Sequence, residues 1–322
     1  MRKKFLGPTS KLIAKLFITC LLLYLLFIKV DLGIVKALIP KINLGVLLLS
    51  LIIFLTRNWF AAKRWQILLA SKNYDIPVIP LIRSYFVGYF FSFFLPTIVG
   101  GDIARGYYLY EAGVDKKECA SSIIVERILG VAAMMVFALI SIIFSFNLVN
   151  NSLIRFIVII PSVVCLVLLI LFYKNQLNFL SWLPEVMIRK LNKLIRVVQS
   201  IHQYNQTPRV LMKGFFYSVV FQLGGIFSVY LIALSIGSNL AFVYFLMLLP
   251  IVWLVSLIPI SLNGLGVREG VFVFLFAAVG MAKETALIIS VIYLLESVAQ
   301  GVLGAIFFLL DQQKIAAIKE YP

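Results

Sequence analysis

Histidine, cysteine and acidic residues are all scarce in this 322-residue chain. His202 is the only histidine, which argues against histidine-based catalysis and histidine-rich metal sites. Cys20, Cys119 and Cys165 lie inside apolar runs without the close spacing of metal ligands, so we interpret them as buried packing residues. The sequence contains no D-x-D pair and no nucleotide-binding glycine loop. We therefore expect no cofactor, no metal, no direct ATP hydrolysis and no enzymatic activity.

Charge of either sign is rare, and apolar residues take its place. Hydrophobic residues make up 62% of the chain, charged residues 13%, and the mean hydropathy is +1.06. An average soluble domain is about half apolar and a quarter charged. Long unbroken apolar runs predict membrane helices rather than a barrel, whose strands are short and alternate. The sequence therefore predicts an all-α integral membrane protein.

The few charges are mostly basic, with a formal net charge of +16. In a membrane protein such an excess is typical of cytoplasmic loops and anionic headgroup contacts, so we do not expect nucleic acid as a partner. The basic residues gather in 1–15 and in 174–213. We therefore expect localisation in the cytoplasmic membrane, with the N-terminus, the segment 174–213 and the C-terminus on the cytoplasmic side.

Six apolar runs are each long enough to cross the hydrocarbon layer. These predicted spans are 12–30, 44–62, 120–146, 156–173, 214–236 and 286–310. Two further apolar regions, 81–110 and 241–281, are interrupted by proline and glycine. The basic loops indicate on which side of the membrane each span ends. The resulting topology requires 81–110 to enter and leave at the cytoplasmic face, and 241–281 to enter and leave at the outer face. We interpret both as re-entrant helical hairpins.

The two interrupted regions share a pattern of proline, then glycine five residues later, then arginine nine residues later. The matching positions are Pro96, Gly101 and Arg105, and Pro259, Gly264 and Arg268. Opposite hairpin orientations predict an inverted repeat with units 44–146 and 214–310, separated by the basic segment 174–213. Such repeats place a binding site near the midplane, where broken helices meet.

The residue types at these breaks suit an anionic ligand. The second arm of each hairpin begins with free N–H groups and the positive end of a helix dipole. Arg105 and Arg268 follow about a turn later and offer a bidentate clamp for phosphate. The alternative interpretation is a pair of glycine-rich packing kinks whose arginines reach toward the membrane surface.

Several further polar residues lie in apolar surroundings, where a charge costs about 2.5–3.5 kcal/mol at a helix centre. We expect Glu126 to pair with Arg105 and Glu296 to pair with Arg268, either in a binding site or as purely structural ion pairs. The full set of candidate substrate-binding residues is Gly101, Asp102, Arg105, Glu126, Arg127, Asn263, Gly264, Arg268, Glu269 and Glu296. We interpret Arg57, Asn58, Lys63 and Arg64, at the end of a span, as headgroup contacts.

The segment 184–205 is not apolar enough to span. Its apolar residues recur every three or four positions with a basic face between them. This pattern is typical of an amphipathic helix on the inner leaflet, or of a docking site for a partner protein.

Five short motifs are spread along the chain: R-W at Arg64–Trp65, LPT-VGGD-R over Leu95–Arg105, ERILG over Glu126–Gly130, NGLGVREG over Asn263–Gly270, and E-x-x-x-x-G over Glu296–Gly301. Together they resemble one known family, the flippase-like transmembrane domain of lysylphosphatidylglycerol synthases (multiple peptide resistance factor). The resemblance implies movement of lipids across the cytoplasmic membrane. In the synthases a separate cytosolic domain transfers the amino acid. The chain stops at Pro322, so we expect a standalone member without that domain.

Three functions remain open on the sequence. The first is a lipid flippase for a phospholipid or other lipid with an anionic or zwitterionic headgroup. The second is a non-catalytic membrane partner of a lipid-modifying enzyme. The third is a glycosyl or aminoacyl transferase acting on lipid-linked substrates. Membrane lipids are the expected partners, and oligomers are possible.

Overall fold

The computed structural model describes residues 32–94, 100–145, 152–174, 192–258, 260–261 and 264–319, together with positions 17, 19–21, 24 and 28. Within these ranges the chain forms helices and connecting turns, with no β-strand. The predicted all-α membrane class is therefore confirmed at this level. The predicted first span, 12–30, falls mostly outside the described residues.

The helices vary from single turns to a rod of 37 residues. The first half contains α2 Leu32–Leu38, η1 Ile39–Lys41, α3 Leu44–Thr56, α4 Asn58–Ala70, α5 Val78–Phe94, α6 Gly100–Glu111 and α7 Lys116–Ser145. The second half contains α8 Ser152–Lys174, α10 Asn192–Gln203, η3 Tyr204–Gln206, α11 Pro208–Ser235, α12 Phe242–Ser256, α13 Val267–Ala277 and α14 Lys283–Lys319.

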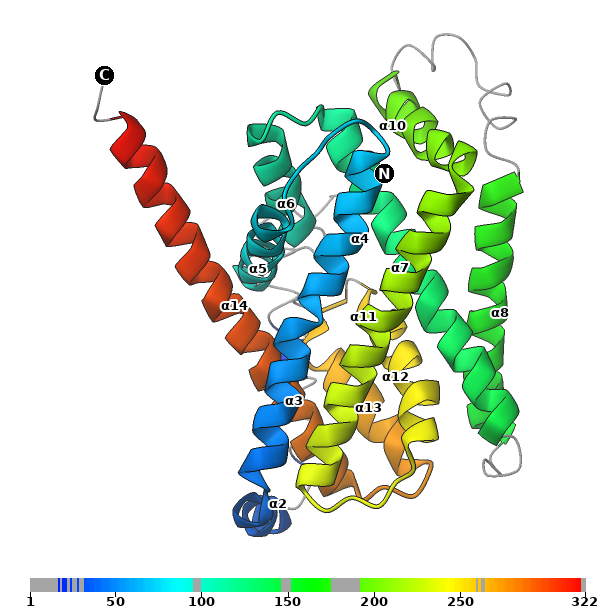
Figure 1. Ribbon diagram of the computed structural model, residues 1–322. Coiled ribbons are helices and arrows are strands. Elements are labelled where there is room, and N and C mark those ends of the chain that lie inside the picture. Colours follow the sequence, from blue (N-terminus) through cyan, green and yellow to red (C-terminus); the bar gives the residue numbers. More distant parts are fainter. Residues whose placement is uncertain are drawn as a thin grey trace, which may run out of the picture.

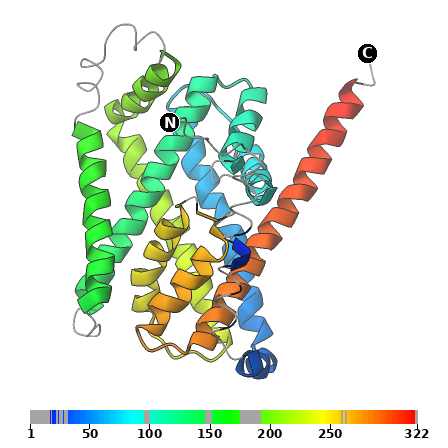
Figure 2. The same ribbon diagram turned by 180° about the vertical axis from the view of Figure 1, so that it is seen from behind.

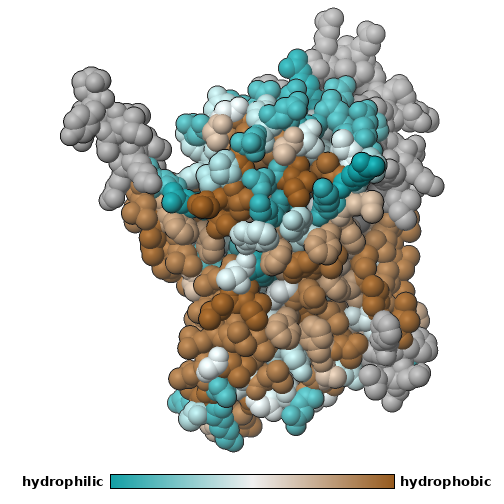
Figure 3. All heavy atoms as spheres, viewed as in Figure 1, coloured by the Kyte–Doolittle hydropathy of each residue, from teal (hydrophilic) through white to brown (hydrophobic). Residues whose placement is uncertain are grey.

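Four helical stretches are long and apolar enough to cross a membrane, among the residues described: Leu44–Ala70, Lys116–Ser141, Pro208–Ser235 and Lys283–Asp311. They correspond to four of the six predicted spans. Helix α8 covers the fifth, 156–173, and its stretch Arg155–Val167 ranks among the shorter apolar helices. Apolar side chains cover most of the face shown in Figure 3, with polar residues gathered mainly at one end. The surface thus has the apolar belt of a multi-pass membrane protein.

Helices α3 and α4 form one nearly continuous path. The Asn43 side chain caps α3 by accepting from the N–H of Val46, and only Arg57 separates α3 from α4, although its N–H still donates to the Ile53 carbonyl at 3.0 Å. The predicted span 44–62 therefore extends to Ala70. The interpretation of its polar end as headgroup contacts is wrong for Arg57, Asn58 and Arg64, which are buried. Their side chains face neighbouring helices, so they contact other parts of the protein and not lipid headgroups.

The two proline- and glycine-interrupted regions each form two short helices. Helices α5 and α6 lie beside each other at the end of the molecule where α4 and α10 also lie, whereas α12 and α13 lie at the opposite end (Figure 1). Pro96 and Pro259 fall outside the described residues. The turn before α13 passes through Gly264 and Gly266 at φ +74° and +80°, a backbone region that side chains disfavour. Glycine therefore permits this reversal.

The bundle contains an apolar core at each end. One core lies around α11 to α14 and includes Phe54 and Ala138, while the other joins α4 to α5 through Trp65 and Leu69. Helices α12 and α13 lie behind α3 and α11 in Figure 1 and in front of them in Figure 2. In both views the C-terminal part of α14 slants away from the other helices. The long helices α7 and α11 pass from one core to the other.

Helix α10 corrects the interpretation of 184–205 as a helix lying on the lipid surface. Its side chain Ile201, with Tyr204 of η3, is buried against Leu68 and Val125 in a small apolar cluster. Lys72, in the turn after α4, donates to the Ser200 carbonyl at 3.1 Å. Partial burial lowers the pKa of the Lys72 ammonium group, although Glu118 opposes that shift. The described part of this segment therefore packs on the protein, and 184–191 lies outside the described residues.

Candidate functional site

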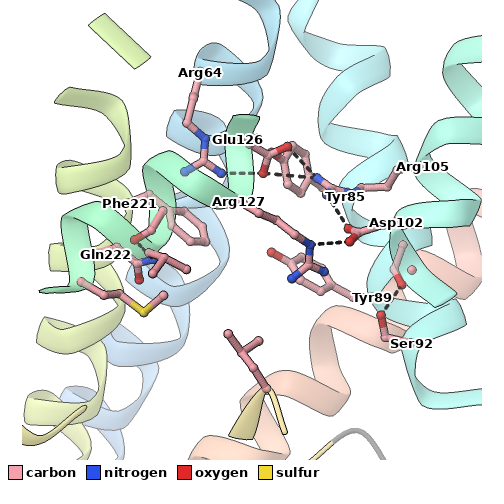
Figure 4. A pocket seen from close by; sticks show the side chains of 16 residues that line it. Arg64, Tyr85, Tyr89, Ser92, Asp102, Arg105, Glu126, Arg127, Phe221 and Gln222 are labelled. Atoms are coloured by element: carbon pink, nitrogen blue, oxygen red, sulfur yellow. Dashed lines mark hydrogen bonds and ion pairs between the residues drawn. The ribbon is translucent and has the colours of Figure 1, made fainter. Parts of the chain in front are cut away.

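A cavity of about 210 Å³ lies between the two apolar cores. Helices α4, α5, α6, α7 and α11 line it, and Leu257, just after α12, closes it (Figure 4). Along α7 the cavity residues follow the buried Ile123 of one core and precede Ala138 of the other. The cavity is therefore a polar layer between two apolar cores.

Five charged side chains form a continuous chain of ion pairs along this cavity (Figure 4). Glu126 accepts from two arginines: its Oε1 lies 2.5 Å from Arg64 Nη2, and its Oε2 lies 3.1 Å from Arg105 Nη1. Arg105 Nη2 lies 2.6 Å from Asp102 Oδ1, and Arg127 Nε donates to the other oxygen of Asp102. The predicted pairing of Glu126 with Arg105 is confirmed. Adjacent on α7, Glu126 and Arg127 serve different partners, because neighbouring helical residues point in different directions.

The network carries more positive than negative charge. Three arginines meet two carboxylates, which leaves one formal positive charge. Arg64, Arg105, Asp102 and Glu126 are buried, whereas the side chain of Arg127 is 41% exposed. An uncompensated cation in a low-dielectric interior attracts an anion strongly. The site is therefore suited to an anionic group that enters from the side of Arg127.

Aromatic rings hold the central arginine in place. The Arg105 guanidinium lies 4.4 Å from the Tyr85 ring centre and 5.0 Å from the Trp65 ring centre. Tyr85 itself donates to the carbonyl of Ala61 at 3.3 Å. Cation–π contact and fixed ring positions restrict the rotamers of Arg105. Its charge is therefore fixed in direction before any ligand arrives.

Gly101 allows α6 to approach α5 closely enough to build this site. A Cβ atom at this position would lie 2.2 Å from Ser92 Oγ and 2.4 Å from the Gly88 carbonyl oxygen. Because the carbonyl belongs to the backbone, it cannot move aside cheaply. Gly101 thus fixes the position of Asp102 and Arg105, which follow on the same helix.

The other predicted site residues that the structure describes, Gly264, Arg268, Glu269 and Glu296, lie outside this cavity lining. Arg268 donates to its neighbour Glu269 at 2.9 Å, and Glu269 also accepts from the N–H of Gly266 at 2.6 Å. Glu269 thus caps the start of α13, so this N–H is already used. Gly264 lies in the preceding turn, where a Cβ atom would lie 3.0 Å from the Ser256 carbonyl oxygen. Asn263 lies outside the described residues.

The predicted pairing of Glu296 with Arg268 is wrong. Glu296 instead lies 2.6 Å from the Ser50 hydroxyl oxygen and 3.0 Å from the Ser228 hydroxyl oxygen, both within hydrogen-bond distance. The reason is the orientation of α14, because the face that carries Glu296 lies against α3 and α11 and not against α13. Arg268 finds its carboxylate one residue away on its own helix.

Arg64 lines the cavity although it is not among the predicted site residues, and the same is true of Tyr85, Tyr89, Phe221 and Gln222. One signal was available for Arg64. It lies three residues after Ala61 and four before Leu68, two apolar residues whose helical spacing predicts a face turned toward other helices. Tyr85, Tyr89 and Phe221 carry no such signal, since aromatic residues are frequent throughout this chain.

Comparison with known proteins connects this architecture to a family. The family model described as the lysylphosphatidylglycerol synthase TM region matches residues 12–304. A UPF0104 membrane protein of Pyrococcus horikoshii is 23% identical over 282 residues, covering 79% of this chain and 83% of its relative. No solved structure matches the chain. A match over this much of the sequence, on a helical bundle with its charged cavity between two cores, shows that the chain belongs to the lysylphosphatidylglycerol synthase TM region family.

Proposed function

We propose that this protein moves a phospholipid with an anionic headgroup across the membrane. The observation that carries the proposal is the buried cavity in which three arginines meet only two carboxylates. Membership of the family supports a lipid-related role in the membrane. A phosphate bearing one negative charge balances the excess positive charge of the network.

The three arginines take different parts in this proposal. Arg127 is partly exposed and meets the phosphate first, while Arg105 lies deeper with its guanidinium between two carboxylates. Asp102 links the two arginines, and Arg127 exchanges its bond to Asp102 for a bond to the phosphate. The acyl chains stay in the lipid outside the bundle, beside its apolar exterior.

We also propose that α5–α6 and α12–α13 are re-entrant hairpins that enter the membrane from opposite faces, as two halves of an inverted repeat. Their location at opposite ends of the bundle supports this arrangement. Each hairpin then closes one end of the path, and the charged cavity lies between them. Alternating movement of the two ends would expose the cavity to one leaflet at a time.

The proposed reaction leaves the lipid chemically unchanged. The polar side chains of the cavity are arginines, carboxylates, tyrosines, the amide of Gln222 and the hydroxyl of Ser92, which donates to the backbone carbonyl of Gly88 and not to a base. Charge balance, rather than a nucleophile with its base, is the property that this set offers. We therefore propose a transporter and not a transferase.

The test is lipid movement in reconstituted vesicles. Purified protein is placed in phosphatidylcholine vesicles that contain a fluorescent phosphatidylglycerol, and an impermeant quencher reports the outer leaflet over time. We expect Arg127→Gln to slow the exchange by about tenfold, since a charge-assisted hydrogen bond contributes about 1.5–3 kcal/mol. Arg105→Gln should abolish exchange.

Arg83→Gln is the matched control. Arg83 is 40% exposed and lies 3.5 Å from Asp311 at the edge of the bundle, away from the cavity. This variant should exchange lipid at the wild-type rate. Wild-type rates in both Arg105→Gln and Arg127→Gln, or an altered lipid in the vesicle extract, would contradict the proposal.

A further inference from the structure

Glu296 differs from the other interior carboxylates in having no cation partner. Asp102, Glu126 and Glu269 each pair with an arginine. Among the described residues, no lysine or arginine forms an ion pair with Glu296, although it is buried. A bare carboxylate in such surroundings is costly, and protonation removes that cost.

The hydrogen bonds around Glu296 account for one more proton than an ionised carboxylate allows. Ser50 Oγ lies 2.6 Å from Glu296 Oε1 and 3.0 Å from the carbonyl oxygen of Ser228. The hydroxyl of Ser228 lies 3.0 Å from Glu296 Oε2. If Glu296 is ionised, the two hydroxyl hydrogens both point to it, and the contact with the Ser228 carbonyl has no hydrogen.

A proton on Glu296 gives a hydrogen to each of these three contacts, which are the contacts of 3.0 Å or less; the two serine hydroxyl oxygens also lie 3.2 Å apart. The carboxyl O–H then donates to Ser50, the Ser50 hydroxyl donates to the Ser228 carbonyl, and the Ser228 hydroxyl donates back to the second carboxyl oxygen. This arrangement uses each hydroxyl once as a donor. The oxygens already contact one another directly, so the site as built holds a proton and not a larger cation.

Few other charged groups face this cluster. Arg57, at the junction of α3 and α4, acts electrostatically on Glu296, but its guanidinium lies over the rings of Phe54 and Phe221. The titratable groups on the neighbouring elements include Arg268 of α13, which already pairs with Glu269, and Tyr293 of α14 itself. Helix α5 adds Tyr89, and α2 adds the exposed Lys36. Phe221 also lines the charged cavity, so only one ring separates Arg57 from it.

We propose that Glu296 is a proton-binding site within the bundle, and that the proton bound there travels with the anionic headgroup. The second half of this inference rests on the lipid movement proposed above. An anion in the cavity offsets the positive charge of Arg57 and its neighbours, which makes a proton on Glu296 more favourable at low dielectric. Because coupling is reciprocal, the proton also favours the anion.

Infrared difference spectroscopy tests the proton site without any transport. The protein is placed in nanodiscs of phosphatidylcholine with and without phosphatidylglycerol, and spectra at acid and alkaline pH are subtracted. A protonated carboxyl gives a carbonyl band that shifts in D₂O, which separates it from lipid esters. We expect this band in the wild type and its loss in Glu296→Gln, which retains a donor for Ser50.

The matched control is Asp311→Asn on the same helix, which removes a carboxylate paired with Arg83 outside the cavity lining and should leave the band intact. Phosphatidylglycerol should strengthen the band at a given pH in the wild type, and Arg57→Gln should reduce that effect. A missing band in the wild type, or its persistence in Glu296→Gln, overturns the proton site whatever the result of the lipid assay.

The coupling is tested separately in vesicles with an imposed pH difference. The wild type should concentrate fluorescent phosphatidylglycerol in the leaflet that faces the more alkaline side, by about tenfold for each unit of pH difference if one proton accompanies one anion. Glu296→Gln should lose this accumulation. Lipid movement that ignores the pH difference, or follows a sodium gradient instead, overturns the coupling. If no lipid moves at all, the proposed function and the coupling both fail, while the infrared result still decides the proton site.

Discussion

At the scale of single residues, the charged side chains of the cavity are stabilised because each pairs with a charge of opposite sign. Glu126 serves two arginines, and Asp102 serves two as well. Removing one partner of a buried ion pair leaves the other charge without compensation, which costs far more than losing a surface pair. Glu126 is therefore the residue on which the network depends most.

Glu126→Gln should lower the free energy of unfolding by about 3 kcal/mol, because Arg64 and Arg105 both lose their buried counter-charge. Arg83→Gln, at the more exposed pair with Asp311, should change it by less than about 1 kcal/mol. Thermal unfolding of both purified variants in the same detergent measures the difference. Equal losses in the two variants would show that the interior network contributes no special stability.

At the scale of helices, close approach and not apolar burial alone positions the site. Helix α6 reaches α5 through Gly101, and α14 reaches α5 through Gly301 and Gly304. Small residues at helix contacts are common in membranes, where lipid chains are as apolar as the helix surfaces. The glycines thus decide where the charged residues of α6 end up.

Gly101→Ala should destabilise the protein by about 1–3 kcal/mol and disturb the site, because the new methyl group overlaps a backbone carbonyl of α5. Gly106→Ala, on the same helix, is the matched control. Its Cβ would lie 3.5 Å from the nearest atom, Ile123 Cδ1, so a small gain from reduced chain entropy is expected. Thermal unfolding of the two variants, with lipid exchange as a second measurement, checks this pair. A harmless Gly101→Ala would mean that the helices have room to separate.

At the scale of the whole molecule, the polar layer lies between two apolar cores, with a short helix pair at each end. The connection after α6 and the connection after α11 lie at opposite ends of the bundle (Figure 1). The basic segments predict that the end carrying α10 faces the cytoplasm.

Single cysteines test this orientation. In a background without the three native cysteines, Ala112→Cys and Asn239→Cys place one exposed thiol in each connection. A membrane-impermeant maleimide added to intact cells should label Asn239→Cys, and should label Ala112→Cys only after permeabilisation. Labelling of both from the same side would exclude the proposed orientation of the two hairpins.

Local sequence rules predicted the helices well because each apolar run and each glycine break acts over a few residues. The breaks around 95–99 and before Val267 were recognisable, and so was the pairing of Glu126 with Arg105 across two helices. The pairing of Glu296 was not, because it depends on which face of α14 meets α3 and α11. The burial of Arg64 follows in the same way from how α4 meets α7 and α11.

The sequence by itself determined that this chain is a helical membrane protein, because its apolar content and the length of its apolar runs require lipid, and not water, around most of its surface. It also determined which residues carry charge into that interior. Only the tertiary structure decided which charges meet, since partners such as Arg64 and Glu126 lie 62 positions apart and approach only when whole helices pack. For the same reason it was helix packing that left Glu296 with two hydroxyls in place of an arginine.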